Sequence, residues 1–147
     1  MKVLFDTNIV LDALQGREPW KNDAEYLVMA VAQERIEGFL TTKQLCDIWY
    51  LGRQIHKNEE NASRKAQEYV SKLCQIFKVI DIVEQDIVNA LSYNCADFED
   101  AVIMAAAERT GMERIVTRNI KDYPSTFSSY LIKNLQDMRL EIKELIK

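Results

Sequence analysis

Four aspartates in this sequence stand where apolar segments begin, end or are interrupted. Asp6 follows an apolar, β-favouring run, and Asp122 comes shortly after another. Asp47 interrupts an apolar helical segment, and Asp100 directly precedes a second one. If the fold brings these carboxylates into one crevice, they repel one another, by about 4 kcal/mol for two charges 4 Å apart at an effective dielectric constant of 20. Such a group requires a divalent cation or partial protonation.

Oxygen ligands without histidine or cysteine favour Mg²⁺ or Mn²⁺. His56 is the sole histidine, which excludes a His-rich zinc site. A magnesium ion held by carboxylates, with water in its open positions, can generate hydroxide, polarise a phosphate and stabilise a leaving oxygen. The sequence has no Gly-rich phosphate loop, no Ser-His-Asp set and no Cys–His pair. These residue types therefore suit metal-dependent phosphoryl chemistry.

Strand-like and helical segments alternate along the chain, which predicts an α/β fold. We expect a single domain over residues 1–147, a three-layer α/β/α sandwich with a central parallel sheet of four to five strands. The segments expected to form strands are 2–5, 37–41, 77–80, 114–117 and 130–132. Asp6 then lies at the carboxyl end of the first strand, where open α/β sheets bind ligands. Its position is equally typical of a turn residue that accepts backbone N–H groups.

A helix predicted over residues 42–55 carries the second acid. Asp47 is the only charged residue between Lys43 and Arg53, and its neighbours are apolar nearly all round. We therefore expect several partners to bury this helix. The helical wheel nevertheless turns Asp47 away from the face that carries Ile48, which favours an exposed carboxylate.

The third acid begins the most apolar helix of the sequence, predicted from about residue 98 to Gly111. Asp97, Glu99 and Asp100 crowd its first turn. Acids there complement the helix dipole, and Asp97 can cap N–H groups. That structural role accounts for one or two carboxylates, so Asp100, next to the apolar part of the helix, favours a functional role.

The net charge of −4 has the wrong sign for binding nucleic acid through overall charge. A nucleic-acid substrate therefore requires bridging cations or a local basic rim. The basic residues that flank the acidic segments are Lys43, Arg53, Lys57, Arg118 and Lys121. A solvated surface explains any one of them equally well.

The three cysteines, Cys46, Cys74 and Cys95, lie far apart inside apolar segments. They are predicted to be buried free thiols in a reducing compartment. The sequence has no run of about 18 apolar residues, and strand-like residues begin at Lys2, so it predicts neither a membrane span nor a signal peptide. We expect a cytoplasmic protein.

Three stretches of the sequence resemble the PIN-domain ribonucleases, including the VapC-type toxins. They are Phe5-Asp6-Thr7-Asn8, Asp97-Phe98-Glu99-Asp100-Ala101 and Ile115-Val116-Thr117-Arg118-Asn119-Ile120-Lys121-Asp122-Tyr123. Their order and spacing match the family over essentially the whole chain. The resemblance implies a central parallel sheet and an Mg²⁺- or Mn²⁺-dependent endoribonuclease acting on RNA. It also implies a homodimer in many members, neutralised by a small antitoxin.

The resemblance also assigns individual site residues. Asp6 matches the first family acid and Asp100 the third, and Thr7 and Asn8 match residues that orient the first. Asp47 falls where the family usually has glutamate on the helix after the second strand. Its side chain is one carbon shorter, which shortens its reach toward a metal.

The fourth family acid usually lies where this chain has Asn119, and Asp122, three residues on, is the alternative. An amide contributes an oxygen but no charge, so a second metal would be held weakly or only with substrate bound. Asp97 and Thr117 are the expected supporting residues of this site.

Other protein classes fit the motifs less well. A haloacid dehalogenase phosphatase wants a second aspartate two residues after the first, where this chain has Asn8. A receiver domain needs an acidic pair near the first strand, which the residues before Asp6 do not supply. The alternative that stays open is a PIN fold with weak or no catalysis that binds RNA or a protein, because Asp47 and Asn119 depart from the family pattern. Metal-dependent RNA cleavage would separate the two.

Overall fold

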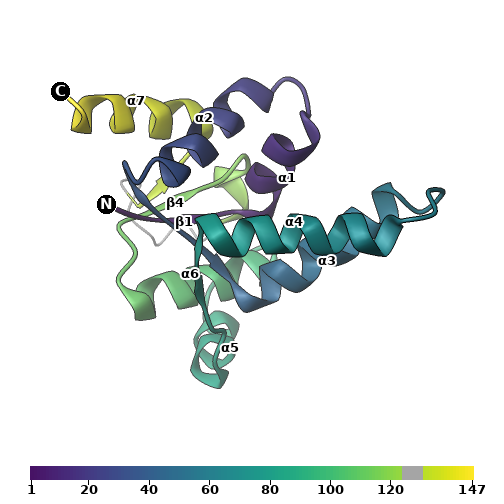
Figure 1. Cartoon of the computed structure of the whole chain (residues 1–147). Coiled ribbons are helices and arrows are strands. Elements are labelled where there is room, and N and C mark those ends of the chain that lie inside the picture. The colour runs from purple at the N-terminus through teal and green to yellow at the C-terminus, as the bar shows by residue number, and fades with distance from the viewer. Residues whose placement is uncertain (124–130) are drawn as a thin grey trace.

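A computed structural model describes residues 1–123 and 131–147 of the chain. Within them lies one parallel sheet, in which β1 is central and the strand order is β3-β2-β1-β4-β5 (Figure 1). The strands are β1 (Lys2–Phe5), β2 (Glu37–Thr41), β3 (Lys78–Ile80), β4 (Arg114–Val116) and β5 (Ile132–Lys133). The predicted α/β/α fold with a parallel sheet is confirmed. The last strand begins two residues later than predicted, and Tyr130 lies outside the described residues.

Helices connect the strands and cover both faces of the sheet (Figure 1). They are α1 (Thr7–Gln15), α2 (Lys21–Ala32), α3 (Thr42–Ile55), α4 (Ala62–Ile76), α5 (Glu84–Leu91), α6 (Phe98–Thr110) and α7 (Leu135–Leu145), with a short 3₁₀ helix at Ile120–Asp122. No helix in the described part of the chain is both long enough and apolar enough to cross a membrane.

Strand β1 divides the core into two layers, because its successive side chains point to opposite faces. Val3 and Phe5 pack in one cluster with residues of α1, α2 and α7. Leu4 packs in the other cluster, against Ile103 and Met104 of α6. All three strand side chains are fully buried, as expected for a strand covered on both faces.

Helix α6 is the central helix that its composition predicts. Every residue from Ala101 to Ala107 is buried. Asp97 caps its first turn by accepting a hydrogen bond from the Asp100 N–H at 3.2 Å, and Gly111 ends it in the left-handed conformation. The segment that follows Asp100 is buried on all sides, so the packing of this segment fixes the position of Asp100.

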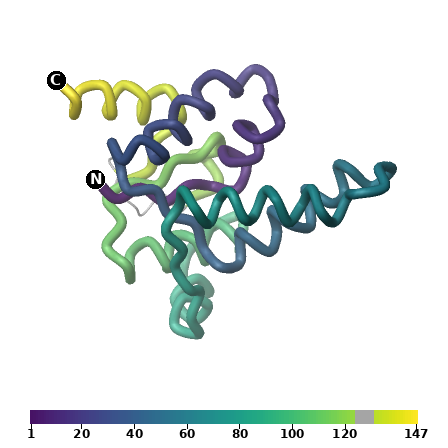
Figure 2. Tube along the Cα trace, viewed as in Figure 1, coloured from purple at the N-terminus to yellow at the C-terminus, as the bar shows by residue number. Residues whose placement is uncertain are grey.

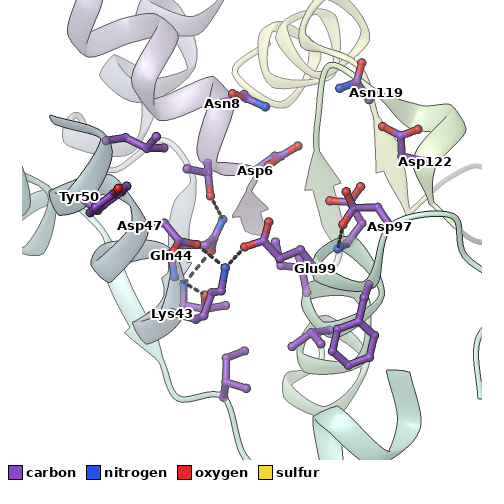
Figure 3. Close-up of a pocket in the computed structure, with 18 of the residues that line it drawn as sticks. Asp6, Asn8, Lys43, Gln44, Asp47, Tyr50, Asp97, Glu99, Asn119 and Asp122 are labelled. Atoms are coloured by element: carbon purple, nitrogen blue, oxygen red, sulfur yellow. Dashed lines mark hydrogen bonds and ion pairs between the residues drawn. The ribbon is translucent and has the colours of Figure 1, made fainter. Parts of the chain in front are cut away.

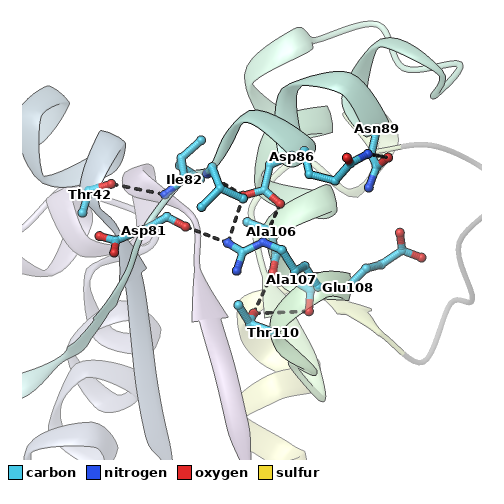
Figure 4. A network of polar contacts seen from close by, with 12 residues as sticks. Thr42, Asp81, Ile82, Asp86, Asn89, Ala106, Ala107, Glu108 and Thr110 are labelled. Atoms are coloured by element: carbon cyan, nitrogen blue, oxygen red, sulfur yellow. Dashed lines mark hydrogen bonds and ion pairs between the residues drawn. The ribbon is translucent and has the colours of Figure 1, made fainter.

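A buried ion pair holds α5 against α6 (Figure 4). Asp86 is fully buried, and its two oxygens accept hydrogen bonds from Arg109 at 2.8 and 2.9 Å. Burial raises the pKa of Asp86, but its hydrogen bonds with Arg109 and the Val83 N–H outweigh burial and lower that pKa overall. Arg109 also donates to the Asp81 carbonyl, which joins α6 to the segment after β3.

Helix α3 is more exposed than its composition predicts. Only Gln44, Ile48 and Gly52 are buried, whereas Tyr50 and Ile55 are about half exposed. The reason is that α3 and α4 pack on each other as a hairpin whose outer part projects away from the sheet (Figure 2). The prediction that several partners bury α3 is therefore wrong.

The predicted burial of the three cysteines is also wrong. Cys46 and Cys74 are exposed, and Cys95 is partly exposed. Cys46 lies on α3 and Cys74 on α4, so both belong to the hairpin. Periodicity within one helix does not show how few neighbours that helix has.

A substitution at Gly38 of β2 tests how tightly the core cluster that contains Val3 and Phe5 is packed. A Cβ at this position would lie 2.6 Å from both methyl carbons of Val31 and 2.9 Å from the Phe77 ring. We expect Gly38→Ala to lower the free energy of unfolding by about 1–3 kcal/mol, the usual cost of overpacking. Urea denaturation measures the loss.

Ser71→Ala is the control. Ser71 is exposed on α4, and alanine is favoured over serine in a helix by less than about 0.7 kcal/mol. We expect little net change. Equal losses in the two variants would show that β2 does not approach α2 as closely as described.

Candidate active site

A cleft of about 480 Å³ opens at the carboxyl ends of β1 and β2, between α3 and α6 (Figure 3). It is lined by residues from segments that are far apart in the sequence. The lining residues are Asp6, Thr7, Asn8, Thr41, Lys43, Gln44, Asp47, Tyr50, Leu51, Ile82, Ile87, Asp97, Phe98, Glu99, Asp100, Val102, Ile103, Asn119 and Asp122. The four aspartates chosen from the sequence therefore do line one crevice.

Asp6 is the most buried acid of the cleft, with 8% of its surface exposed. The Thr117 hydroxyl at the end of β4 donates a 2.7 Å hydrogen bond to its Oδ2 atom. Burial raises the pKa of Asp6, while the Thr117 hydroxyl and the backbone N–H groups of Thr7 and Asn8 lower it. This carboxylate is held in place and short of solvent, so a cation would bind it strongly.

Asp100 is the acid of the cleft whose ionisation is most clearly disfavoured by its surroundings. Burial and then the charges of Asp6, Asp97 and Asp122 raise its pKa to about 7. Those three carboxylates act on Asp100 because all four gather at the same end of the sheet. Near neutral pH the cleft therefore carries a proton or attracts a cation.

Asp47 is partly exposed, as the helical wheel predicts, and it faces the cleft (Figure 3). Its Oδ2 atom lies 2.5 Å from Lys43 Nζ, one turn earlier on α3. Lys43 also pairs with Glu99 of α6, so one ammonium group joins the two walls of the cleft. The charge of Asp47 is thereby matched by Lys43.

Asn119 and Asp122, the two candidates for the fourth ligand, both line the cleft on the side of β4 (Figure 3). The Asn119 N–H donates to Thr117 Oγ1 at 3.1 Å, and the Asp122 N–H donates to the Asn119 carbonyl at 3.1 Å. The Cys95 thiol donates to the Asp122 carbonyl at 2.7 Å. Both side chains remain available to the cleft, because these contacts use their backbone groups.

Gln44 is a site residue that the sequence reasoning missed. It is buried, and its side-chain amide donates to the Phe5 carbonyl at 2.7 Å and to Thr7 Oγ1 at 3.3 Å. Its Oε1 atom accepts the Thr41 N–H at 2.8 Å. Gln44 thus fixes the start of α3 to the residues on either side of Asp6. Threonine followed three residues later by glutamine is a capping-box pattern, a signal that was present in the sequence.

The predicted basic rim does not form around the cleft. Of its members only Lys43 lines the cleft. Arg118 lies 3.8 Å above the Trp20 ring, and its Nε atom is 3.4 Å from the fully buried Asp12 carboxylate. Cation–π contact and a buried counter-charge hold the guanidinium on the side of α1 and α2.

The three other members of the rim lie elsewhere on the surface. Arg53 contacts the Trp49 ring at 5.8 Å and, with Lys57, lines a separate hollow where α3 meets α4. Lys121 is exposed on the 3₁₀ helix and is not among the residues of the cleft. The spacing of basic residues in the sequence did not reveal which side of each element they occupy.

The donor set suits a hard divalent cation. In residues 1–123 and 131–147 no group of three or more histidine, cysteine, aspartate or glutamate side chains is arranged so that it could hold a metal ion. Mg²⁺, however, is usually bound through one or two carboxylates, with water and substrate phosphates completing the octahedron. Asp6 and Asp100 line the cleft and would supply such a pair of oxygen ligands, and Asp122 and Asn119 lie in the same cleft. The residues therefore fit an open magnesium or manganese site.

A sequence model of the PIN domain matches residues 2–121. The chain belongs to the PIN domain family. Among curated proteins, none matches its sequence. The family assignment therefore rests on the domain model, which covers Asp6, Asp47 and Asp100 of the cleft and ends one residue before Asp122.

Several solved structures share the fold of this PIN domain. A toxin–antitoxin complex from Klebsiella pneumoniae superposes with a TM-score of 0.65 at 20% identity, covering 90% of this chain and 97% of that one. VapBC2 from Rickettsia felis, bound to a promoter DNA fragment, gives 0.63 at 16% identity, with 91% and 98% covered. A Mycobacterium tuberculosis toxin described as cleaving the sarcin–ricin loop gives 0.57 at 14% identity, with 77% and 86% covered. At these identities the likeness establishes the fold.

Asp100→Asn removes an ionisation that the folded protein disfavours. The Asp100 pKa is about 7 in the folded protein against an ordinary value of 3.8, so the parent loses stability as the pH rises from about 4 to about 7. In the absence of divalent cations we expect the variant to be more stable than the parent. The difference in the free energy of unfolding should grow by about 1 kcal/mol between pH 5 and pH 8, a value reduced to allow for the partial exposure of Asp100. Urea denaturation at the two pH values measures the margin.

Glu144→Gln, an exposed position on α7, is the control and is expected to show no such pH dependence. A margin for Asp100→Asn that stays constant with pH would contradict the crowding of carboxylates around Asp100.

Proposed function

We propose that this PIN domain is an Mg²⁺- or Mn²⁺-dependent endoribonuclease that hydrolyses RNA phosphodiester bonds. The observation that carries the proposal is the gathering of Asp6, Asp97, Asp100 and Asp122 in one cleft, where burial and the neighbouring acids raise the pKa of Asp100. A divalent cation stabilises a cluster of carboxylates whose ionised forms repel one another. Membership of the PIN family supports a nuclease.

The proposed roles follow from the contacts of each residue. Asp6 and Asp100 hold the metal, and Asp122 or Asn119 completes the site from the side of β4. When bound, the metal activates water and stabilises charge on the phosphate. Thr117 and Gln44 orient Asp6, through a direct hydrogen bond and through the backbone on either side of it.

Lys43 and Asp47 form the α3 wall of this proposed site. Lys43 is already inside the cleft, paired with Asp47 and Glu99, where a substrate phosphate would approach. A phosphate that takes over the ammonium group frees the Asp47 carboxylate for the metal. Asp47 would then act as a ligand with RNA bound.

The variant Asp6→Asn tests whether Asp6 is a metal ligand or only a turn residue. The variant loses one charge and keeps its shape, so we expect cleavage of a labelled RNA by the Mg²⁺-loaded parent to be abolished in the variant. The metal-free variant should be as stable as the parent or more stable by about 1 kcal/mol. Added Mg²⁺ should raise the melting temperature of the parent more than that of Asp6→Asn, because a ligand stabilises the state that binds it.

Asp81→Asn, outside the cleft, is the matched control and should cleave like the parent. Cleavage that persists in excess EDTA would overturn the metal mechanism. A destabilised Asp6→Asn with a full magnesium response would make Asp6 a turn residue.

A second candidate is a PIN fold with weak or no turnover that binds RNA or protein. The observation that favours it is the pairing of Asp47 with Lys43, together with an amide at Asn119, which leaves fewer free charges for a second metal. Binding of RNA by the magnesium-loaded parent without cleavage would support this candidate over the nuclease.

We further propose that the chain is the toxin of a toxin–antitoxin pair and forms a homodimer. The support is the fold shared with toxin–antitoxin complexes and the character of the cleft, which combines carboxylates with apolar residues such as Leu51 and Ile87. A small antitoxin with a basic, amphipathic segment is complementary to such a surface.

Co-expression with the products of neighbouring genes tests the partner. We expect a small basic protein to co-purify and to suppress cleavage, and light scattering to give twice the mass of the chain. A monomer at high concentration would contradict the dimer. Absence of any co-purifying protein would contradict the partner.

A further inference from the structure

Tyr123 is a buried polar residue that the site described above does not use. It is 5% exposed, and its ring belongs to the core cluster that contains Leu4 and Met104. Leu4 lies two residues before Asp6 on β1, and Met104 lies one turn after Asp100 on α6. The ring is therefore part of the core layer between the strand and the helix that position the two principal acids, and it does not line the cleft itself.

The phenol oxygen of Tyr123 is shielded from solvent and has no hydrogen bond of normal geometry to any described residue. A buried tyrosine hydroxyl usually has a partner. Without one, the protein carries the full cost of removing that hydroxyl from water. Phenylalanine would fill the same space in the core at no such cost, so packing alone does not explain a hydroxyl at this position.

The groups that act on the phenol place it next to the acid cluster. Burial and then the charges of Asp6 and Asp100 raise the pKa of Tyr123 well above its ordinary value, whereas the nearby Thr117 hydroxyl acts in the opposite direction. The Tyr123 phenol is therefore neutral at physiological pH, and its O–H group is a hydrogen-bond donor.

The Thr117 hydroxyl can accept one more donor. A hydroxyl donates one hydrogen bond and accepts two. Thr117 Oγ1 donates to Asp6 Oδ2 at 2.7 Å and accepts the Asn119 N–H at 3.1 Å. Thr117 is fully buried, so water does not reach its remaining acceptor position. A donor without a partner and an acceptor position without a donor thus lie together behind Asp6.

We propose that Tyr123 is a positioning residue of the metal site, whose O–H donates to Thr117 Oγ1 while the Thr117 O–H donates to Asp6 Oδ2. The proposal rests on the metal-dependent function above. By accepting from Tyr123, the Thr117 hydroxyl becomes a stronger donor to Asp6, because hydrogen bonds in a chain polarise one another. The Asp6 carboxylate is then held in one orientation toward the cleft.

The test measures the binding of Mn²⁺ to the full, metal-free chain by isothermal titration calorimetry. Tyr123→Phe removes the hydroxyl and keeps the ring, and Tyr26→Phe, a partly buried position on α2, is the matched control. We expect Tyr123→Phe to raise the Kd for Mn²⁺ about tenfold, because removing a group behind a metal ligand typically costs roughly 10–100-fold in affinity. Tyr26→Phe should bind like the parent.

Variants of Thr117 test whether the effect of Tyr123 passes through its hydroxyl. Thr117→Ser keeps the hydroxyl and should bind Mn²⁺ like the parent, whereas Thr117→Val removes it and should raise the Kd. Adding Tyr123→Phe to Thr117→Val should cause no further loss, because the two residues act in one chain.

Two results would overturn the positioning role while leaving the metal site intact. A Tyr123→Phe protein with the Kd of the parent would make Tyr123 a core residue only. Losses that add up in the double variant would show that the Tyr123 hydroxyl does not act through Thr117.

Absence of Mn²⁺ binding by the parent would instead count against the metal-dependent function. In that case urea denaturation of the metal-free proteins decides the role of the hydroxyl. Tyr123→Phe should lower the free energy of unfolding in the parent and leave it unchanged in Thr117→Val. A Tyr123→Phe protein more stable than the parent, or an equal change in both backgrounds, would overturn the proposal.

Discussion

Everything in this fold depends on keeping a carboxylate at the end of its most buried strand. Asp6 continues a strand whose preceding side chains are fully buried, so its charge is taken out of water by the same packing that stabilises the sheet. An unsatisfied charge there would cost several kcal/mol. Three parts of the chain stabilise the charge of Asp6 and offset that cost. The first turn of α1 offers N–H groups, β4 supplies the Thr117 hydroxyl, and α3 contributes Gln44, which binds the backbone next to Asp6.

The same constraint explains how the two walls of the cleft are built. The α6 wall is held by the buried segment Ala101–Ala107 that follows Asp100, and the Asp86–Arg109 pair ties α5 to it. The α3 wall is held at its start by the capping box of Thr41 and Gln44 and in its middle by Ile48, which is fully buried in the core. Lys43 spans the two walls.

Sequence reasoning found the parts of the site that local patterns determine. Asp6 at a strand end and Asp100 before an apolar helix are visible as abrupt changes from apolar to acidic residues. The helix containing Ala101–Ala107 was predicted to be central because it is apolar on all sides, and it is. Gln44 lay within reach of the same reasoning through the capping-box pattern.

What the sequence did not reveal depends on contacts between distant elements. Arg118 follows β4 by two residues and resembles a rim residue, yet the Trp20 ring and the buried Asp12 hold it on the side of α1 and α2. The exposure of Cys46 and Tyr50 follows from the projection of the α3–α4 hairpin, which no periodicity within α3 encodes. Both errors concern which neighbour a residue meets, and that is a property of the assembled sheet.

The projection of the α3–α4 hairpin also affects how this fold can diverge. Every α3 residue that lines the cleft lies between Lys43 and Leu51, and the remaining turn leads away toward α4. Insertions, deletions or charge changes beyond that point alter neither the anchoring of Asp6 nor the spacing of the acids. The outer part of the α3–α4 hairpin can therefore change in length and surface chemistry while the cleft stays the same.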